Sequence, residues 1–172
     1  MLANSRARAG ARRLERRAHA DYTGGVYGSL LAASVVVGAS SLGVFPRLEL
    51  ALLLLATGVV FWLAHVHAQL FGARMAQRSL DRGTVLHVCR EEWPIVEAAV
   101  PSIVAVLVSP LLGLGVRGAA WLALAVAVIS QVGWATVGAR RAGALWRQVV
   151  LAGAVNLVIG LLIVALKFAL KR

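Results

Sequence analysis

Charged residues are scarce in this chain, and acidic ones are the scarcest. Asp and Glu number 7 against 18 Lys and Arg, so that 15% of the 172 residues are charged while 60% are hydrophobic. A soluble domain of this length needs a larger charged surface to stay in water. The composition therefore excludes an ordinary soluble domain and indicates an integral membrane protein.

Cysteine and catalytic motifs are also nearly missing. Cys89 is the single cysteine, so the chain can form neither an internal disulfide nor a metal site with several thiolates. The sequence has no nucleophile elbow, no glycine-rich phosphate loop and no cluster of aspartates. We therefore expect no enzyme activity, no metal and no cofactor.

The net charge of +11 does not indicate a nucleic-acid partner. Its Lys and Arg residues lie between long apolar runs, which is the distribution that sets membrane topology rather than a footprint for phosphates. We expect a lipid bilayer, and anionic lipids in particular, as the partner of these charges.

Five segments are long and apolar enough to cross a bilayer. A crossing helix needs about 20 apolar residues, and its backbone must be helical because the hydrocarbon core offers no water for hydrogen bonds. The sequence predicts an all-α, polytopic bundle that forms one domain over 22–170, after a basic segment at 1–21. The predicted spans are 22–46, 50–73, 98–116, 118–139 and 148–166.

The distribution of Lys and Arg predicts the orientation of these helices. Thirteen of them fall in 1–21, 74–95 and 140–147, and five fall on the other side. By the positive-inside rule the N-terminus is cytoplasmic and the C-terminus outside, in the inner (plasma) membrane. The loop 74–95 reads as an amphipathic helix on the membrane surface. The arginines expected to contact lipid headgroups are Arg12, Arg13, Arg16, Arg17, Arg74 and Arg78.

Polar side chains inside the spans are the main candidates for function, because they are costly in lipid and usually face the protein interior. His65 shares a helical face with small residues, whereas His67 lies about 200° round the helix and is expected to point outward. Glu97 begins the third span at the same membrane end as His65, so the two can meet and pass a proton. The candidates for an ion or proton pathway are His65, Glu97, Ser102, Gln131 and Asn156.

Each candidate also has a purely structural interpretation. His65 can be a packed histidine, and Glu97 can favour a helix N-terminus while still reaching water. Gln131 and Asn156 can form a hydrogen bond that holds two helices together.

Pro101 and Pro110 are expected to bend the third span. Lys167 is expected to extend to the outer surface.

Several short segments also carry a resemblance to a known group of proteins. They are Tyr27-Gly28, Trp62-Leu-Ala-His65-Val, Glu92-Trp93-Pro94-Ile-Val-Glu97-Ala and Leu166-Lys167. Together they resemble small integral membrane proteins of high-GC actinobacteria, over most of the chain. The resemblance implies a place in the membrane and no activity.

Two hypotheses remain open from the sequence. In the first, the protein is a small channel or transporter for protons or small ions and solutes, whose polar interior is shared between the protomers of a homo-oligomer. In the second, it is a non-transporting scaffold or accessory subunit that binds another membrane protein or anionic lipid. Flux in liposomes separates the two.

The predicted orientation is tested by labelling Cys89, which lies in the loop 74–95. We expect a membrane-impermeant maleimide to leave Cys89 unmodified in intact cells and to label it once the membrane is permeabilised. Labelling from outside intact cells would reverse the topology.

Overall fold

The computed structural model describes residues 2–43, 45–76 and 81–169, with side chains described from Tyr22 onward. These residues form helices and no strand. Five helical segments have the length and composition to cross a membrane, which confirms the number of predicted spans. They are Tyr22–Leu42, Arg47–Met75, Arg82–Leu112, Val116–Arg141 and Trp146–Ala169.

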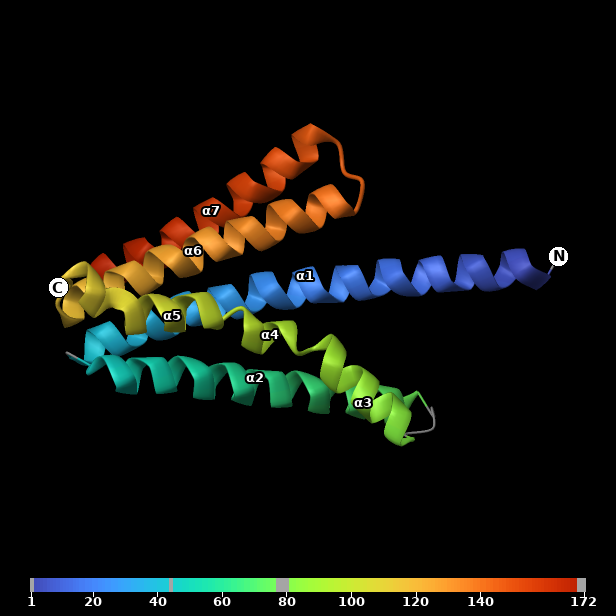
Figure 1. Ribbon diagram of the computed structural model, residues 1–172, viewed down its shortest axis with the longest axis horizontal. Helices are drawn as coiled ribbons and strands as arrows, with labels where there is room; N and C mark the ends of the chain where they lie inside the picture. Colours follow the sequence, from blue (N-terminus) through green and yellow to red (C-terminus); the bar gives the residue numbers. More distant parts are fainter. Residues whose placement is uncertain (1, 44, 77–80, 170–172) are drawn as a thin grey trace.

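The helices run up and down between the two ends of the bundle, and the two termini lie at opposite ends (Figure 1). The first helix, α1, is continuous over Leu2–Leu42, so residues 2–21 of the basic segment and the first span share one helix. The other long helices are α2 (Arg47–Met75), α6 (Val116–Arg141) and α7 (Trp146–Ala169).

The third span is not the single helix over 98–116 that the sequence predicts. The segment Arg82–Leu112 instead holds α3 (Arg82–Glu91), which lies within the loop 74–95, and then α4 (Pro94–Glu97), α5 (Val100–Val108) and the 3-10 turn η1 (Ser109–Leu112). Pro94, Pro101 and Pro110 each lack the N–H that continues a helix, so the axis changes near each of them. Gly113, with φ of 66°, then ends the span in a conformation that suits glycine.

Within the loop 74–95, where the sequence predicts an amphipathic helix, the structure has the short helix α3, and its place on a membrane surface stays a prediction. Asp81 caps its first turn by accepting a hydrogen bond from the Thr84 backbone N–H at 3.1 Å. Hydrogen bonds from the Thr84 side chain and backbone lower the pKa of Asp81. At the other end of α3, Trp62 of α2 donates its indole N–H to the Cys89 carbonyl at 2.9 Å. These contacts place α3 beside α2.

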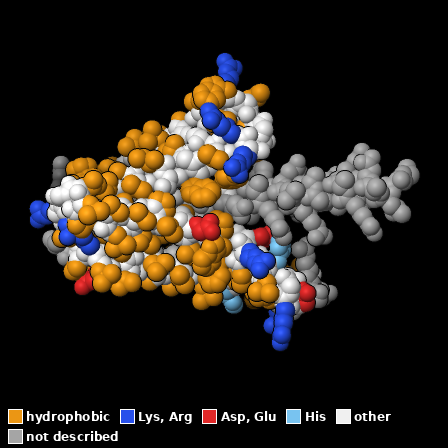
Figure 2. All heavy atoms as spheres, viewed as in Figure 1, with side chains coloured by type: hydrophobic (Ala, Val, Ile, Leu, Met, Phe, Trp, Pro, Cys, Tyr) orange, Lys and Arg blue, Asp and Glu red, His pale blue; other side chains and the backbone are white. Residues whose placement is uncertain are grey.

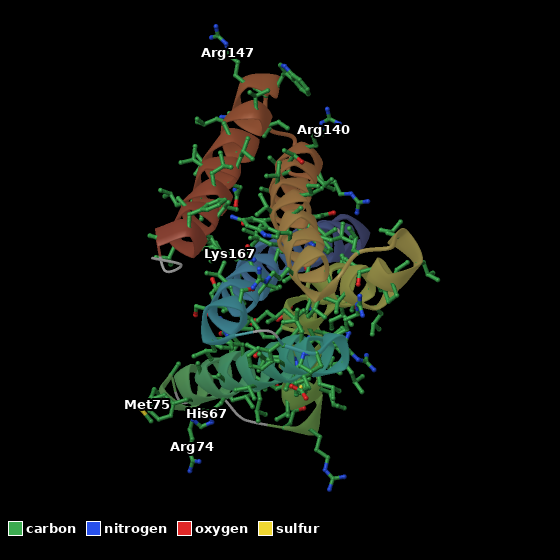
Figure 3. All side chains as sticks on the ribbon, turned by 90° about the vertical axis from the view of Figure 1, so that its left-hand side faces the viewer. His67, Arg74, Met75, Arg140, Arg147 and Lys167 are labelled. Carbon is green, nitrogen blue, oxygen red and sulfur yellow. The ribbon has the colours of Figure 1, made fainter. Side chains whose placement is uncertain are left out.

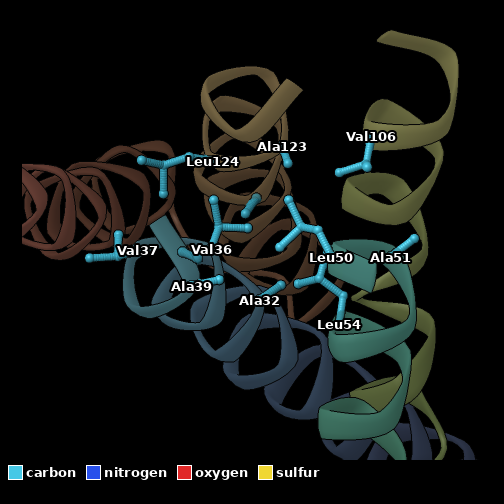
Figure 4. Close-up of a cluster of buried hydrophobic side chains, with 12 residues drawn as sticks. Ala32, Val36, Val37, Ala39, Leu50, Ala51, Leu54, Val106, Ala123 and Leu124 are labelled. Carbon is cyan, nitrogen blue, oxygen red and sulfur yellow. The ribbon is translucent and has the colours of Figure 1, made fainter. Parts of the chain in front are cut away.

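Helix α1 is the centre of the bundle. It packs most extensively against α6 and also contacts α2, α4 and α7. The buried core is built mainly from Ala and Val, which let helices approach closely where lipid removes the hydrophobic driving force for packing. Figure 4 shows this cluster, whose members are Ala32, Ala33, Val36, Val37, Ala39, Leu50, Ala51, Leu54, Val106, Ala123, Leu124 and Ala127.

The outer surface of the bundle is strongly apolar. Figure 2 shows hydrophobic side chains over its flank, with Lys and Arg gathered towards the two ends. Leu111, Ile129 and Leu162 are 85%, 69% and 64% exposed. A surface of this kind suits contact with lipid chains or with other membrane helices.

One polar clamp joins the helices at the end where α1 stops. Arg47, in the first turn of α2, donates its Nε to the Ser109 hydroxyl at 3.1 Å and its Nη2 to the Leu114 carbonyl at 2.5 Å. Ser109 is fully buried and donates in turn to the Val106 carbonyl. The clamp ties α2 to the end of the broken third span.

Gly28 provides a test of how closely α1 packs. A Cβ added there would lie 2.4 Å from the Ile95 carbonyl oxygen, whereas a Cβ at Gly38 of the same helix would meet nothing within 4 Å. We expect Gly28→Ala to lower the free energy of unfolding by about 1–3 kcal/mol. Gly38→Ala should leave it unchanged or slightly raised. Unfolding of the detergent-solubilised protein in SDS measures the free energy of unfolding of both variants. Equal changes in the two variants would contradict the close packing of α1 at Gly28.

Candidate functional site

His65 and Glu97, the predicted proton pair, lie in different surroundings, and proton transfer between them stays a prediction. His65 is half-buried, its Nδ1 donates to the Phe61 carbonyl at 3.1 Å, and its ring lies 5.0 Å from the Tyr27 ring. Glu97 is exposed instead, and the structure gives these two side chains no hydrogen bond or ion pair with one another. His67 is exposed and points away from the bundle (Figure 3), as its place on the opposite face predicts.

Gln131 and Asn156 do meet, as the sequence suggests. Gln131 is fully buried, and its Nε2 donates to the Asn156 side-chain oxygen at 3.2 Å and to the Asn156 carbonyl at 3.3 Å. Asn156 also donates to the Ala152 carbonyl of its own helix. Ser102 is bonded elsewhere, to the Ala123 carbonyl at 3.3 Å. These bonds join α6 to α7 and α5 to α6 without forming a common polar chamber.

Two adjoining hollows lie along α1 and α6, and one of them reaches α3 and α4. One, of about 740 Å³, runs between α1 and the second half of α6. The other, of about 330 Å³, adjoins it and extends to α3 and α4. They share Tyr22, Trp134 and Arg141 as lining residues, and we call the two together the groove.

Glycines allow two aromatic side chains to pack into the seam beside the groove. Trp134 of α6 lies over Gly25 of α1, where an added Cβ would come within 2.4 Å of the ring. Tyr22 of α1 lies in the same way over Gly138 of α6, and the Tyr22 and Trp134 rings are 5.9 Å apart. Each helix thus packs an aromatic ring against a glycine of the other helix. This packing positions both rings at the groove.

The charged part of the groove carries two guanidinium groups and one carboxylate. Arg90 of α3 and Arg141 of α6 line it together with Glu97 and Trp93. The Arg141 guanidinium lies 5.8 Å from the centre of the Tyr22 ring, within the range of a cation–π contact. The adjoining hollow is lined mainly by apolar side chains, including Val26, Leu30 and Ala135. The groove therefore has a cationic end and an apolar end.

The prediction that Lys167 extends to the outer surface is wrong. Its side chain is 3% exposed, and the ammonium lies 4.2 Å from the centre of the Trp121 ring. Figure 3 shows Lys167 among the helices, whereas Arg74, Arg140 and Arg147 point away from them. The Trp121 ring gives the ammonium one favourable contact within the protein.

Of the arginines predicted to contact lipid headgroups, Arg74 is exposed at the end of α2. The side chains of Arg12, Arg13, Arg16 and Arg17, and residue Arg78 as a whole, lie outside the described part of the chain. The groove arginines, Arg90 and Arg141, were not among the predicted contacts.

Sequence reasoning missed the groove because its residues are scattered. Tyr22, Trp93, Trp134 and Arg141 belong to four different predicted segments, and each is unremarkable by itself. A usable signal was present: aromatic residues near the ends of spans, with arginines close by, are typical of a membrane interface.

Comparison of the chain with protein-family models, with curated proteins and with solved structures found no match.

A double-mutant cycle measures the bond between Gln131 and Asn156. We expect Gln131→Leu and Asn156→Leu to be coupled by about 0.6–1.7 kcal/mol in the free energy of unfolding, the range found for hydrogen bonds between membrane helices. Pairing Gln131→Leu with Ser34→Ala is the control, because Ser34 is exposed and bonds the Leu30 carbonyl of its own helix. No coupling in the first cycle would mean that the two amides do not hold α6 to α7.

Proposed function

We propose that the protein is a non-transporting accessory protein of the membrane that binds an anionic lipid in the groove. The observation that carries this proposal is the position of Arg90 and Arg141 beside an apolar hollow of about 740 Å³. A phospholipid has the matching form, with a phosphate at one end and acyl chains at the other.

The aromatic side chains support the same reading. Tyr22, Trp93 and Trp134 line the charged end of the groove. Tyr and Trp favour the level of lipid headgroups, where one edge of the ring is wet and the other is in hydrocarbon. Glu97 adds a carboxylate that can accept a hydrogen bond from a hydroxylated headgroup.

The packing between the two ends of the bundle favours this role over a channel through one protomer. Along α1 and α6, Ala32, Ala33, Val36, Ala123 and Ala127 are all buried, at no more than 3% exposure. The polar candidates Ser102 and Gln131 are bonded to neighbouring helices. The strongly exposed apolar flank provides a surface for contact with another membrane protein or a second copy.

Native mass spectrometry of delipidated protein tests lipid binding in the groove. We expect phosphatidylglycerol to be retained in preference to phosphatidylcholine with the same chains, and Arg141→Gln to weaken its binding about fivefold, since one arginine near a headgroup contributes about 1 kcal/mol. Arg140→Gln is the matched control, because Arg140 packs on Trp146 outside the groove.

Two outcomes would contradict the proposal. If Arg140→Gln and Arg141→Gln weaken lipid binding equally, the binding reflects general attraction between opposite charges and not a site in the groove. Proton or ion flux in liposomes that contain this protein alone, above that of empty liposomes, would restore the channel or transporter hypothesis.

A further inference from the structure

The charged end of the groove contains two cations and a carboxylate that do not pair with one another. Arg90, Arg141 and Glu97 line the same hollow of about 330 Å³, and all three side chains are exposed. In the part of the chain that the structure describes, no ion pair joins Glu97 to either arginine. The hollow therefore has room for a ligand that contacts both the cations and the carboxylate.

The backbone that carries Glu97 is fixed on both sides. Glu97 is the last residue of α4, which packs against both α1 and α2. On the α1 side, a Cβ added at Gly28 would lie 2.4 Å from the Ile95 carbonyl oxygen. On the α2 side, a Cβ added at Gly58 would lie 3.6 Å from the Cα atom of Val96. Because α4 is held closely by two helices, the Glu97 carboxylate is positioned before a ligand binds.

The two arginines also extend from helices that are held against a neighbour. Arg90 lies in the last turn of α3, where the adjacent Cys89 carbonyl accepts the Trp62 indole N–H at 2.9 Å. Arg141 is the last residue of α6, and its guanidinium lies 5.8 Å from the centre of the Tyr22 ring. The three charged groups therefore come from three different helices of a packed assembly.

The charges of the hollow match a headgroup with a single phosphate. Two arginines and one glutamate leave one net positive charge among the described lining residues, which a phosphodiester balances. A second phosphate would be repelled by the Glu97 carboxylate. An ionised carboxylate only accepts hydrogen bonds, so the part of the headgroup beyond the phosphate must donate to it. A hydroxyl group does so without adding a charge.

We propose that Glu97 selects phospholipids in which the single phosphate carries a polyhydroxyl headgroup, such as glycerol. The proposal rests on the lipid site proposed for the groove and adds a headgroup preference to it. The arginines bind the phosphate that all phospholipids share. Glu97 accepts a hydrogen bond from a headgroup hydroxyl and is the residue that determines specificity.

Two lipids of equal charge test the role of Glu97. Phosphatidylglycerol and phosphatidylmethanol each have one phosphodiester and can carry the same acyl chains, but only phosphatidylglycerol has hydroxyl groups in its headgroup. In native mass spectrometry of the delipidated wild-type protein, we expect phosphatidylglycerol to bind about fivefold more tightly, as one hydrogen bond to an exposed carboxylate allows. Glu97→Ala should bring the ratio of the two dissociation constants close to one.

Two further variants separate headgroup selection from lipid binding. Arg141→Gln should weaken the binding of both lipids and leave their ratio at the wild-type value, because it acts on the phosphate that they share. Glu49→Ala is the matched control, since it removes an exposed carboxylate in the first turn of α2, outside the groove. This control should also leave the ratio at the wild-type value.

Three outcomes would overturn the proposed role of Glu97. Equal binding of the two lipids by the wild-type protein, or a ratio that Glu97→Ala does not change, would do so and leave the lipid site intact if Arg141→Gln still weakens binding more than Arg140→Gln. Tighter binding of phosphatidylethanolamine than of phosphatidylglycerol would assign Glu97 to an ammonium group instead of a hydroxyl. Failure of the lipid site itself is distinguishable, because Arg140→Gln and Arg141→Gln would then weaken phosphatidylglycerol equally.

The deacylated headgroup distinguishes a lipid from a soluble polyol phosphate. We expect glycerophosphoglycerol at millimolar concentration to leave phosphatidylglycerol bound, because it lacks the acyl chains that would occupy the adjoining apolar hollow. Displacement of the lipid at that concentration, lost in Glu97→Ala, would assign the carboxylate to a soluble ligand and overturn the lipid preference.

Discussion

The close approach of α1 to α4 and α6 is the constraint on which the rest of the structure depends. Inside a bilayer, burying apolar surface between helices contributes little to stability. The stability must come instead from van der Waals packing between closely fitting helices. Gly25 and Gly28 allow this contact, because neither position has room for a further carbon atom. Once α1 is seated, Tyr22 and Trp134 are positioned, and with them the groove.

The polar residues of the bundle fall into two groups, according to whether they bond one helix to another or line a hollow. Gln131 donates to Asn156 between α6 and α7, and the Arg47 clamp donates to backbone and hydroxyl oxygens near the turn after η1. These residues stabilise helix contacts. Arg90 and Arg141 differ, because both line a hollow that is large enough for part of another molecule. The proposed function rests on this second group.

The sequence predicted the number of spans and their approximate bounds, because long uncharged runs leave few alternatives in lipid. It also predicted the meeting of Gln131 with Asn156. It did not predict the breaks in the third span beyond the presence of bends, since hydropathy carries no information on helix direction. It misplaced Lys167, because burial of that ammonium depends on a ring 46 positions earlier in the sequence. Helix pairing, which also creates the groove, is set by contacts between distant segments that periodicity within one segment cannot reveal.

Helix α7 is held mainly along one side, where it packs against α6, and most of its remaining surface faces outward. This helix is the least buried of the five spans, at 17% of its most apolar stretch, and its 24 residues extend about 36 Å. A hydrocarbon core of about 30 Å is shorter, and such a helix adapts chiefly by tilting. A change in bilayer thickness is therefore expected to alter the tilt of α7 and its contacts with α6 before it disturbs the packing of α1 against α6.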